Sequence, residues 1–169
     1  MAKTAEVGRM APDFDLETDD GGRVKLSDLT GKPVVVYFYP KDDTSGCTLE
    51  ALDFTKSAKA FAAAGAKVIG ISPDTAKSHD KFKKKHKLVV TLAADPDKEA
   101  IEAYGVWVEK SMYGRKYMGV ERATFLVGPD RRIKEIWRKV KVPGHVEAVL
   151  EAAKGIVRIP DFRHRPRFC

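Results

Sequence analysis

Apolar residues follow two different spacings along this chain. In some segments they form short runs or alternate with polar residues, which predicts β-strands, and in others they recur every three or four positions, which predicts α-helices. The run Val34–Tyr39 is apolar at every position and lies between Pro33 and Pro40. Its β-branched and aromatic residues predict a central strand that is buried on both faces. We expect further strands at 14–16, 24–26, 67–72, 88–92, 124–127 and 133–137.

A helical spacing follows this strand. Ala51, Phe54, Ala58 and Phe61 are three or four residues apart, and Gly65 comes after them. This pattern predicts a helix of about four turns that ends at the glycine. We expect further helices at 75–87, from Asp95 onward with Asp95 as the N-cap, and at 143–153.

The order of these elements predicts the fold class. Strands and helices alternate, and the chain then adds a strand pair around Gly128-Pro129-Asp130 and a last helix. This order is typical of an α/β fold with a central mixed β-sheet flanked by helices. The turn 19–22 between two short strands predicts a β-hairpin near the N-terminus.

The composition fits one globular domain. The chain has 169 residues, of which 43% are hydrophobic, and a domain of this length buries about 70% of its surface on folding. We expect a single domain over residues 1–155 and a basic C-terminal tail over 156–169, where Pro160 and Pro166 interrupt any periodicity. No apolar run approaches the roughly 20 residues of a membrane span, and the first residues do not resemble a secretory signal. The sequence therefore predicts a soluble cytoplasmic protein without a membrane partner.

The net charge of +7 raises the question of an acidic partner such as nucleic acid. Lys77–Lys87 has six lysines against Asp80, and the residues from Gly155 onward have four arginines against Asp161. The aromatic residues are few, Phe82 in the first segment and Phe162 and Phe168 in the second, and they do not form the closely spaced set that stacks on successive single-stranded bases. We interpret the first as a solvated helix face and the second as a basic arm, and we do not expect nucleic acid as a partner.

The chain has two cysteines, Cys47 and Cys169. They are far apart and form no CxxC pair, so we expect neither a disulfide framework nor a zinc site. His79 and His86 are two helical turns, or about 10.5 Å, apart, which is too far to bind one ion. We therefore expect no metal and no cofactor. A lone cysteine in such a chain is either a small buried side chain or a reactive thiol.

The position of Cys47 favours a reactive thiol. It follows the central strand and Pro40 at the expected start of the next helix, where α/β folds bind ligands. The helix dipole and the free backbone N–H groups stabilise a thiolate there. Thr44 lies three residues earlier, where its hydroxyl can cap the same turn. The alternative is that Cys47 fills space in the core and that Thr44 only caps the helix.

Several segments resemble one protein family. Pro40, Thr44 and Cys47 have the spacing of the peroxidatic motif of the peroxiredoxins, and the surrounding residues 38–48 resemble the Q-type, or bacterioferritin-comigratory, peroxiredoxins. The resemblance extends to residues 12–14, 104–107, 113–119 and 122–126 and spans roughly residues 5–155. It implies a thioredoxin-like fold and the thiol-dependent reduction of hydrogen peroxide and organic hydroperoxides.

The resemblance also implies a role for each motif residue. Cys47 would attack a peroxide oxygen and become a sulfenic acid, Thr44 and Pro40 would shape the pocket, and Arg122 would complete the site. Without the resemblance, Arg122 would be interpreted as a surface arginine beside Glu121. The family further implies a monomer that is regenerated by thioredoxin or by another thiol such as glutathione.

The chain departs from the family at the second cysteine. Many Q-type members have a resolving cysteine five residues after the nucleophile, where this chain has Leu52, and others have it in the next helix, where residues 81–87 include none. Two routes remain open. In the route we favour, an external thiol reduces the sulfenic acid directly, so one cysteine suffices. In the other, Cys169 is the resolving cysteine, because the 14 residues after Gly155 can span roughly 46 Å.

A function from another class also fits the basic surface. The chain could be a binding or holdase protein with a redox fold that contacts acidic partners. The two hypotheses differ in what a Cys47→Ser variant should lose. A peroxidase would lose peroxide consumption, whereas a binding protein would keep a steeply salt-dependent affinity.

Overall fold

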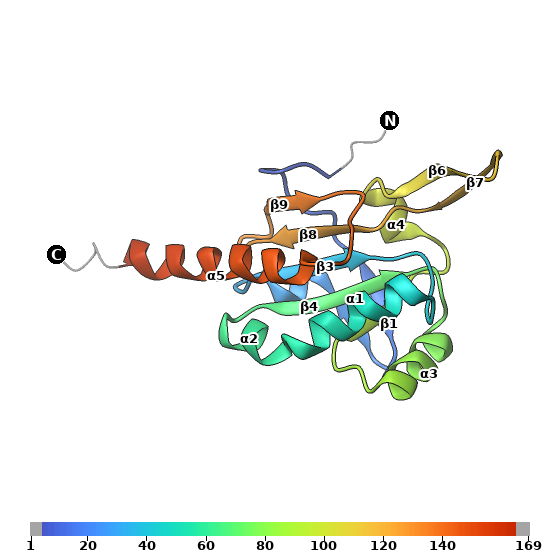
Figure 1. The fold of residues 1–169 in the computed structure, drawn as a ribbon. Helices are drawn as coiled ribbons and strands as arrows, with labels where there is room; N and C mark the ends of the chain where they lie inside the picture. The colour runs from blue at the N-terminus through green and yellow to red at the C-terminus, as the bar shows by residue number, and fades with distance from the viewer. Residues whose placement is uncertain (1–4, 165–169) are drawn as a thin grey trace.

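The computed structural model describes the backbone of residues 5–164 and the side chains of residues 5–156. Its main sheet has seven strands in the order β2-β1-β5-β4-β3-β8-β9 (Figure 1). Strands β3, β4 and β5 are parallel. Strand β1 pairs antiparallel with β5, β8 pairs antiparallel with β3, and β9 pairs antiparallel with β8. The predicted mixed sheet and N-terminal hairpin are therefore confirmed. The strands span Asp15–Thr18 (β1), Arg23–Lys25 (β2), Val34–Phe38 (β3), Lys67–Ser72 (β4), Thr91–Ala94 (β5), Ala123–Val127 (β8) and Ile133–Trp137 (β9).

Strand β3 lies inside the sheet, as its apolar run predicts. All five of its residues are buried, and it pairs in parallel with β4 and antiparallel with β8. Val35 and Tyr37 join the apolar cluster on one face, whereas Val36 and Phe38 join the cluster on the other. The ring of Tyr37 lies so close to β4 that a Cβ on Gly70 would be 2.7 Å from Cζ of the ring. This register therefore requires glycine at position 70.

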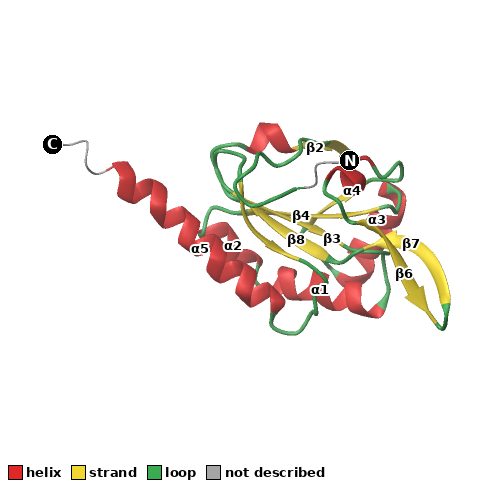
Figure 2. Cartoon of the chain, turned by 90° about the horizontal axis from the view of Figure 1, so that it is seen from above, coloured by secondary structure: helices red, strands yellow, loops and turns green. Residues whose placement is uncertain are grey.

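Helices cover both faces of the sheet (Figure 2). On one face α1 (Ser45–Lys56), α2 (Ala58–Ala63), α3 (Ala76–His86) and α5 (His145–His164) contribute Phe54, Phe61, Phe82 and Val149 to a common cluster. On the other face α4 (Glu99–Ala103) and the 3-10 helix η1 (Leu26–Leu29) contribute Ile101 and Leu26. Within the described residues, no helix has both the length and the apolar character needed to cross a membrane.

Two helices differ in extent from the sequence predictions. The helix expected to run to Gly65 is interrupted at Ser57, where φ is −95° and ψ is 8°, so it forms α1 and α2. Helix α5 was expected to end at Ala153 but continues to His164 and projects past the sheet (Figure 1). It thus passes through residue 155, and the division of the chain into residues 1–155 and 156–169 stays a prediction.

The segment around Asp95 also differs from its prediction. Strand β5 begins at Thr91 instead of residue 88. The Asp95 carboxylate accepts hydrogen bonds from the backbone N–H groups of Glu99 and Ile101, at 2.9 and 2.8 Å, but α4 begins only at Glu99. Asp95 therefore accepts hydrogen bonds from the free N–H groups at the start of α4, although a turn lies between it and the helix. It does not occupy the N-cap position.

A separate hairpin, which the sequence analysis did not predict, projects from the body (Figures 1 and 2). It consists of β6 (Trp107–Met112) and β7 (Arg115–Val120), joined by Tyr113 and Gly114. These two turn residues have φ values of 50° and 77°, as the two-residue turns of hairpins require. Met112, Tyr113, Tyr117 and Met118 are exposed, so the alternation of buried and exposed residues that reveals a strand is missing here.

Candidate active site

Cys47 lies beyond the carboxyl end of β3, as the third residue of α1. The first helical hydrogen bond runs from the N–H of Thr48 to the carbonyl of Thr44, at 2.9 Å. The N–H groups of the residues before Thr48 therefore have no acceptor inside the helix and can stabilise an anion. Cys47 is 2% exposed and is a free thiol. The predicted position of Cys47 at the start of a helix is confirmed.

Arg122 lies against the sulfur of Cys47. It precedes β8, whose first residue, Ala123, pairs with Phe38, the last residue of β3. Arg122 therefore lies at the carboxyl end of β3, where Cys47 also lies. Its Nη2 is 3.4 Å from Sγ of Cys47, and its Nη1 donates to Oε1 of Glu50 at 2.7 Å. Burial alone would lower the pKa of Arg122, but the Cys47 sulfur and the Glu50 carboxyl together raise it. A charged guanidinium is thus held beside the thiol.

Glu50 belongs to this site, and the sequence analysis missed it. Its side chain is 0% exposed, and its Oε2 has no hydrogen-bond partner among the described residues. Burial raises the pKa of Glu50 to about 7, although Arg122 acts to lower it. A signal was present in the sequence, because Glu50 is one helical turn after Cys47, on a helix face that it shares with the apolar Phe54. Glu50 holds the guanidinium in place through Nη1.

The raised pKa of Glu50 predicts how stability depends on pH. Because its ordinary value is 4.5, the folded protein binds this proton more tightly than the unfolded chain does. The contribution of Glu50 to the free energy of unfolding should therefore fall as the pH rises from 4.5 through about 7. Glu50→Gln should remove this pH-dependent loss, which for such a shift is on the order of 3 kcal/mol. Denaturant unfolding of both proteins at several pH values measures it.

The difference in the free energy of unfolding between Glu50→Gln and the unmodified protein isolates the contribution of Glu50, because the other titrating groups are the same in both. We expect the glutamine variant to gain relative stability at high pH and to lose this advantage below pH 4.5. A stability difference that is constant with pH would contradict the raised pKa.

Thr44 lies close to Cys47 in the chain, but its hydroxyl is used differently from the prediction. Thr44 occupies the N-cap position of α1, yet its side chain does not cap the helix. Instead Oγ1 donates a hydrogen bond to the carbonyl of Lys41 at 3.0 Å. The predicted capping bond is therefore wrong. With its proton donated to Lys41, the hydroxyl oxygen is left as an acceptor, which suits the O–H of a hydroperoxide.

Gly46 leaves room for the guanidinium beside Cys47. A Cβ at position 46 would be 3.0 Å from Nη2 of Arg122. A side chain there would require the guanidinium to shift by a few tenths of an ångström from its place beside the sulfur. Glycine at position 46 avoids this displacement.

A buried polar cluster holds the loop that precedes α1. The Asp42 carboxylate accepts hydrogen bonds from the hydroxyls of Tyr39 and Ser78, at 2.6 and 2.7 Å. It also faces Nδ1 of His79 at 2.8 Å. The sequence analysis assigned no role to Asp42 or His79, because nothing in their spacing shows that the loop reaches α3.

Asp42, Asp74 and His79 also meet the distance requirement for a metal site, since their ligand atoms lie within 4.8 Å of one another. The hydrogen bonds favour a different use. Nε2 of His79 faces the carbonyl of Ala93 at 3.0 Å and Nδ1 faces a carboxylate, so both ring nitrogens face acceptors. A metal ligand needs a free lone pair on one of them. We therefore interpret the cluster as a hydrogen-bond network.

A second buried pair lies near Arg122. Oγ1 of Thr124, on β8, is 2.8 Å from Nε2 of His145. Burial, followed by the charge of Arg122, lowers the pKa of His145 to about 4. The imidazole is therefore neutral at pH 7, so His145 adds no positive charge beside the guanidinium.

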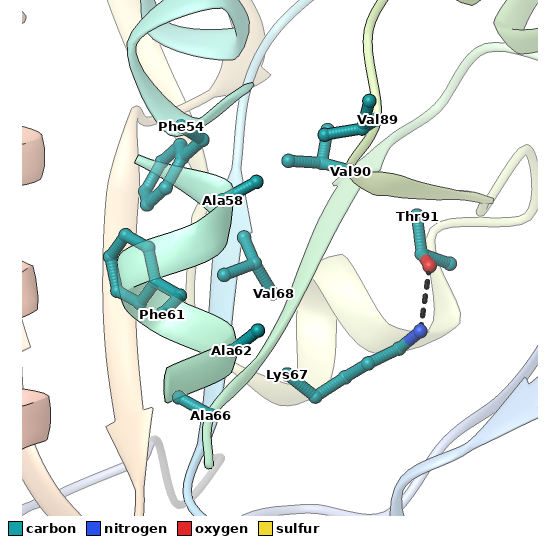
Figure 3. A pocket seen from close by; sticks show the side chains of 10 residues that line it. All are labelled: Phe54, Ala58, Phe61, Ala62, Ala66, Lys67, Val68, Val89, Val90 and Thr91. Carbon is teal, nitrogen blue, oxygen red and sulfur yellow. Dashed lines mark hydrogen bonds between the residues drawn. The ribbon is translucent and has the colours of Figure 1, made fainter. Parts of the chain in front are cut away.

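An apolar pocket lies away from Cys47, at the end of the sheet where β3 and β4 begin (Figure 3). Phe54, Phe61 and Val90 are among the side chains that line it, and Lys67 at its rim donates to Thr91 at 2.9 Å. None of its lining residues is a cysteine or another strong nucleophile. The thiol chemistry therefore belongs at the opposite end of β3.

The remaining predicted residues have less distinct positions. Pro40 is half-buried two residues after β3, and Leu52 is half-buried against the apolar cluster on the α1 side of the sheet. Cys47 is the one cysteine among the residues that the structure describes. The candidate resolving residue Cys169 lies outside them.

Comparisons with known proteins agree with this site. Residues 7–136 match the model of the AhpC/TSA family. The chain is 49% identical over 151 residues to Peroxiredoxin Bcp of Bacillus subtilis, which covers 89% of this chain and 96% of that protein. It is also 38% identical over 149 residues to Peroxiredoxin Bcp of Escherichia coli, covering 88% of this chain and 96% of that protein.

Solved structures are similar over the same length. A cysteine-to-serine mutant of PrxQ from Xylella fastidiosa gives a TM-score of 0.86 at 39% identity and covers 91% of this chain and 98% of its own. The bacterioferritin comigratory protein of Xanthomonas campestris gives 0.84 at 41% identity and covers 90% and 99%. These similarities confirm the predicted thioredoxin-like fold.

Proposed function

Since the chain belongs to the AhpC/TSA family and, within it, to the Bcp/PrxQ peroxiredoxins, it is a thiol-dependent peroxidase, and we propose that Cys47 is its peroxidatic residue. The observation that carries this proposal is the 3.4 Å distance between Nη2 of Arg122 and Sγ of Cys47 at the start of α1. A cysteine that only filled space in the core would not need a buried guanidinium beside its sulfur.

The reaction proceeds by nucleophilic attack. The Cys47 thiolate attacks one oxygen of the peroxide, an S–O bond forms and the O–O bond breaks. The sulfur is oxidised to a sulfenic acid, and the other oxygen leaves as water or an alcohol after taking up a proton. Peroxide is the oxidant, so the step needs no further electron acceptor.

Ionisation of the thiol supplies only part of the rate. A cysteine with an ordinary pKa of about 8.5 is about 3% ionised at pH 7, so full ionisation gains at most about 30-fold. The larger contribution comes from Arg122, whose fixed positive charge stabilises the oxygen on which negative charge develops. The Thr44 hydroxyl and the first backbone N–H groups of α1 align the peroxide with the sulfur.

For regeneration we favour a cycle that uses one cysteine. Position 52 holds a leucine packed against the core, so no cysteine in α1 can resolve the sulfenic acid. An external thiol, from thioredoxin or a glutathione-type reductant, then attacks the sulfenic sulfur, releasing water and leaving a mixed disulfide that a second thiol reduces. A free thiol of this kind suits a reducing compartment, and we place the enzyme in the cytoplasm, acting as a monomer.

Intact mass spectrometry distinguishes the two cycles. After one equivalent of hydrogen peroxide, we expect both the unmodified protein and Cys169→Ser to gain one oxygen atom. If Cys169 resolves the sulfenic acid, the unmodified protein will instead lose two hydrogen atoms while the variant still gains oxygen. The control Cys47→Ser should show neither change. Oxidation of that control to the same extent would contradict the assignment of Cys47.

The basic helix α3 does not support a separate binding function. Lys83, Lys84 and Lys85 form ion pairs with Asp19, Asp80 and Asp43, at 3.1, 3.1 and 2.7 Å. Three of the lysines that suggested an acidic partner are thus paired within the chain. We therefore propose no binding or holdase function, and no nucleic-acid partner.

A further inference from the structure

The loop between β3 and α1 carries Asp42, and we infer that a buried Asp42–His79 link fixes the position of this loop for peroxide reduction. His79 would then be a positioning residue that acts through the loop without touching the peroxide. This inference rests on the proposed role of Cys47 and adds a second element, α3, to the machinery of the same reaction.

Asp42 is bound from several directions. It is 8% exposed, and its carboxylate receives the Tyr39 and Ser78 hydroxyls and faces Nδ1 of His79. Its backbone N–H donates to Oδ2 of Asp74 at 2.8 Å. A buried carboxylate with this many partners has one stable position, because any displacement would leave a buried polar atom unpaired.

His79 connects the loop to the body of the protein. It is 0% exposed on α3, and its Nε2 donates to the carbonyl of Ala93 on β5 at 3.0 Å. One imidazole ring therefore joins the active-site loop to the central sheet through both of its nitrogens. Such a ring cannot shift without breaking a buried hydrogen bond at each end.

The neighbouring Asp43 provides a natural comparison. It also reaches α3, where its carboxylate contacts Lys85 at 2.7 Å and His86 at 2.9 Å. Asp43 is exposed, however, and exposed ion pairs contribute little to structure. The chain thus has a buried and an exposed link between the same loop and the same helix, and the buried one determines the position of the loop.

The position of the loop matters because the reacting groups follow it directly. Thr44 and Cys47 are two and five residues after Asp42. A misplacement of about 1 Å between reacting groups can cost about 10²-fold in rate. Loss of the link should therefore slow the reaction with peroxide, which needs alignment, more than a reaction that needs only a thiolate.

The test compares two reactions of Cys47 in His79→Phe, which keeps an aromatic ring but loses both hydrogen bonds. Stopped-flow oxidation by hydrogen peroxide should be slower by about 10- to 100-fold. Alkylation of the same thiol by iodoacetamide should be unchanged or faster, since it requires no alignment with Arg122. Both rates are measured below the onset of thermal unfolding of each variant. Asp43→Asn is the matched control and should keep both rates.

A pair of substitutions at Asp42 separates position from charge. The side-chain amide of Asp42→Asn can hydrogen-bond Nδ1 of His79 through either its oxygen or its NH2 group and keep the link, so its oxidation rate should stay within about threefold of the unmodified protein. Asp42→Ala should be as slow as His79→Phe.

Three outcomes would overturn the inference. They are an unchanged oxidation rate in His79→Phe, an equal fall of its oxidation and alkylation rates, and an Asp42→Asn variant as slow as Asp42→Ala. Failure of the proposed function would look different, because the unmodified protein would then not be oxidised at Cys47 at all.

Discussion

Replacing Cys47 with serine should abolish peroxide reduction. A serine hydroxyl fills nearly the same volume at the start of α1 but does not ionise near neutral pH, so the nucleophile is lost while the fold is retained. We expect the rate to fall by about 10⁴-fold or more, the scale observed when a covalent nucleophile is removed from an enzyme. Consumption of hydrogen peroxide in the presence of a thiol reductant measures this directly.

Cys169→Ser is the matched control for that substitution, because it removes the other thiol of the chain. It should leave the rate of the first oxidation unchanged in either regeneration cycle. Peroxide consumption at the normal rate in Cys47→Ser would show that the reacting group lies elsewhere. A melting curve close to that of the unmodified protein would show that the loss comes from chemistry.

Replacing Arg122 with alanine should have the second largest effect. The guanidinium is 3.4 Å from the sulfur, in a buried site where charge interactions are strong. Removing a preorganised group that stabilises developing charge costs about 10²- to 10³-fold. This exceeds the roughly 30-fold that a change in thiolate fraction can explain. Rates of sulfenic acid formation, measured from neutral pH to a pH at which the thiol is fully ionised, separate the two contributions.

Arg122→Lys tests the geometry of the guanidinium. Lysine keeps a positive charge but cannot contact Sγ of Cys47 and Oε1 of Glu50 at once with a planar fork. We expect a rate between those of the alanine variant and the unmodified protein. The outcome that would contradict this role is an equal rate of sulfenic acid formation in Arg122→Ala and in the unmodified protein when Cys47 is fully ionised in each. Arg122 would then not stabilise the transition state.

Much of the architecture could be predicted because the core strands bury both faces. Val34–Phe38 is apolar at every position, and so is most of Ala123–Val127, and in the sheet they are adjacent buried strands. The predictions failed in segments where the burial of side chains leaves no pattern in the sequence. In Trp107–Val120, exposed apolar side chains hide two strands, and at Ser57 a single residue with non-helical angles divides a continuous apolar face.

The candidate site was predictable only as far as motif spacing extends. Cys47 and Thr44 are close in the chain, whereas Arg122 was assigned through a resemblance, and its contact with the sulfur depends on the pairing of β8 with β3. Glu50 and His79 are polar residues whose burial is a property of the packed structure. A charged residue on an apolar helix face signals Glu50, but nothing local to His79 indicates that it faces Asp42.

The projecting hairpin has a consequence for the behaviour of the protein in concentrated solution. Strands β6 and β7 pair only with each other among the described residues, so each has an outer edge of unpaired backbone groups that could accept a strand from a second copy. The hairpin carries Lys110, Arg115 and Lys116 against Glu109, so it has a net positive charge. Two copies that approach edge to edge would repel each other, and this repulsion would weaken as salt is added. This repulsion opposes edge-to-edge association of two hairpins, and it does so more strongly at low salt than at high salt.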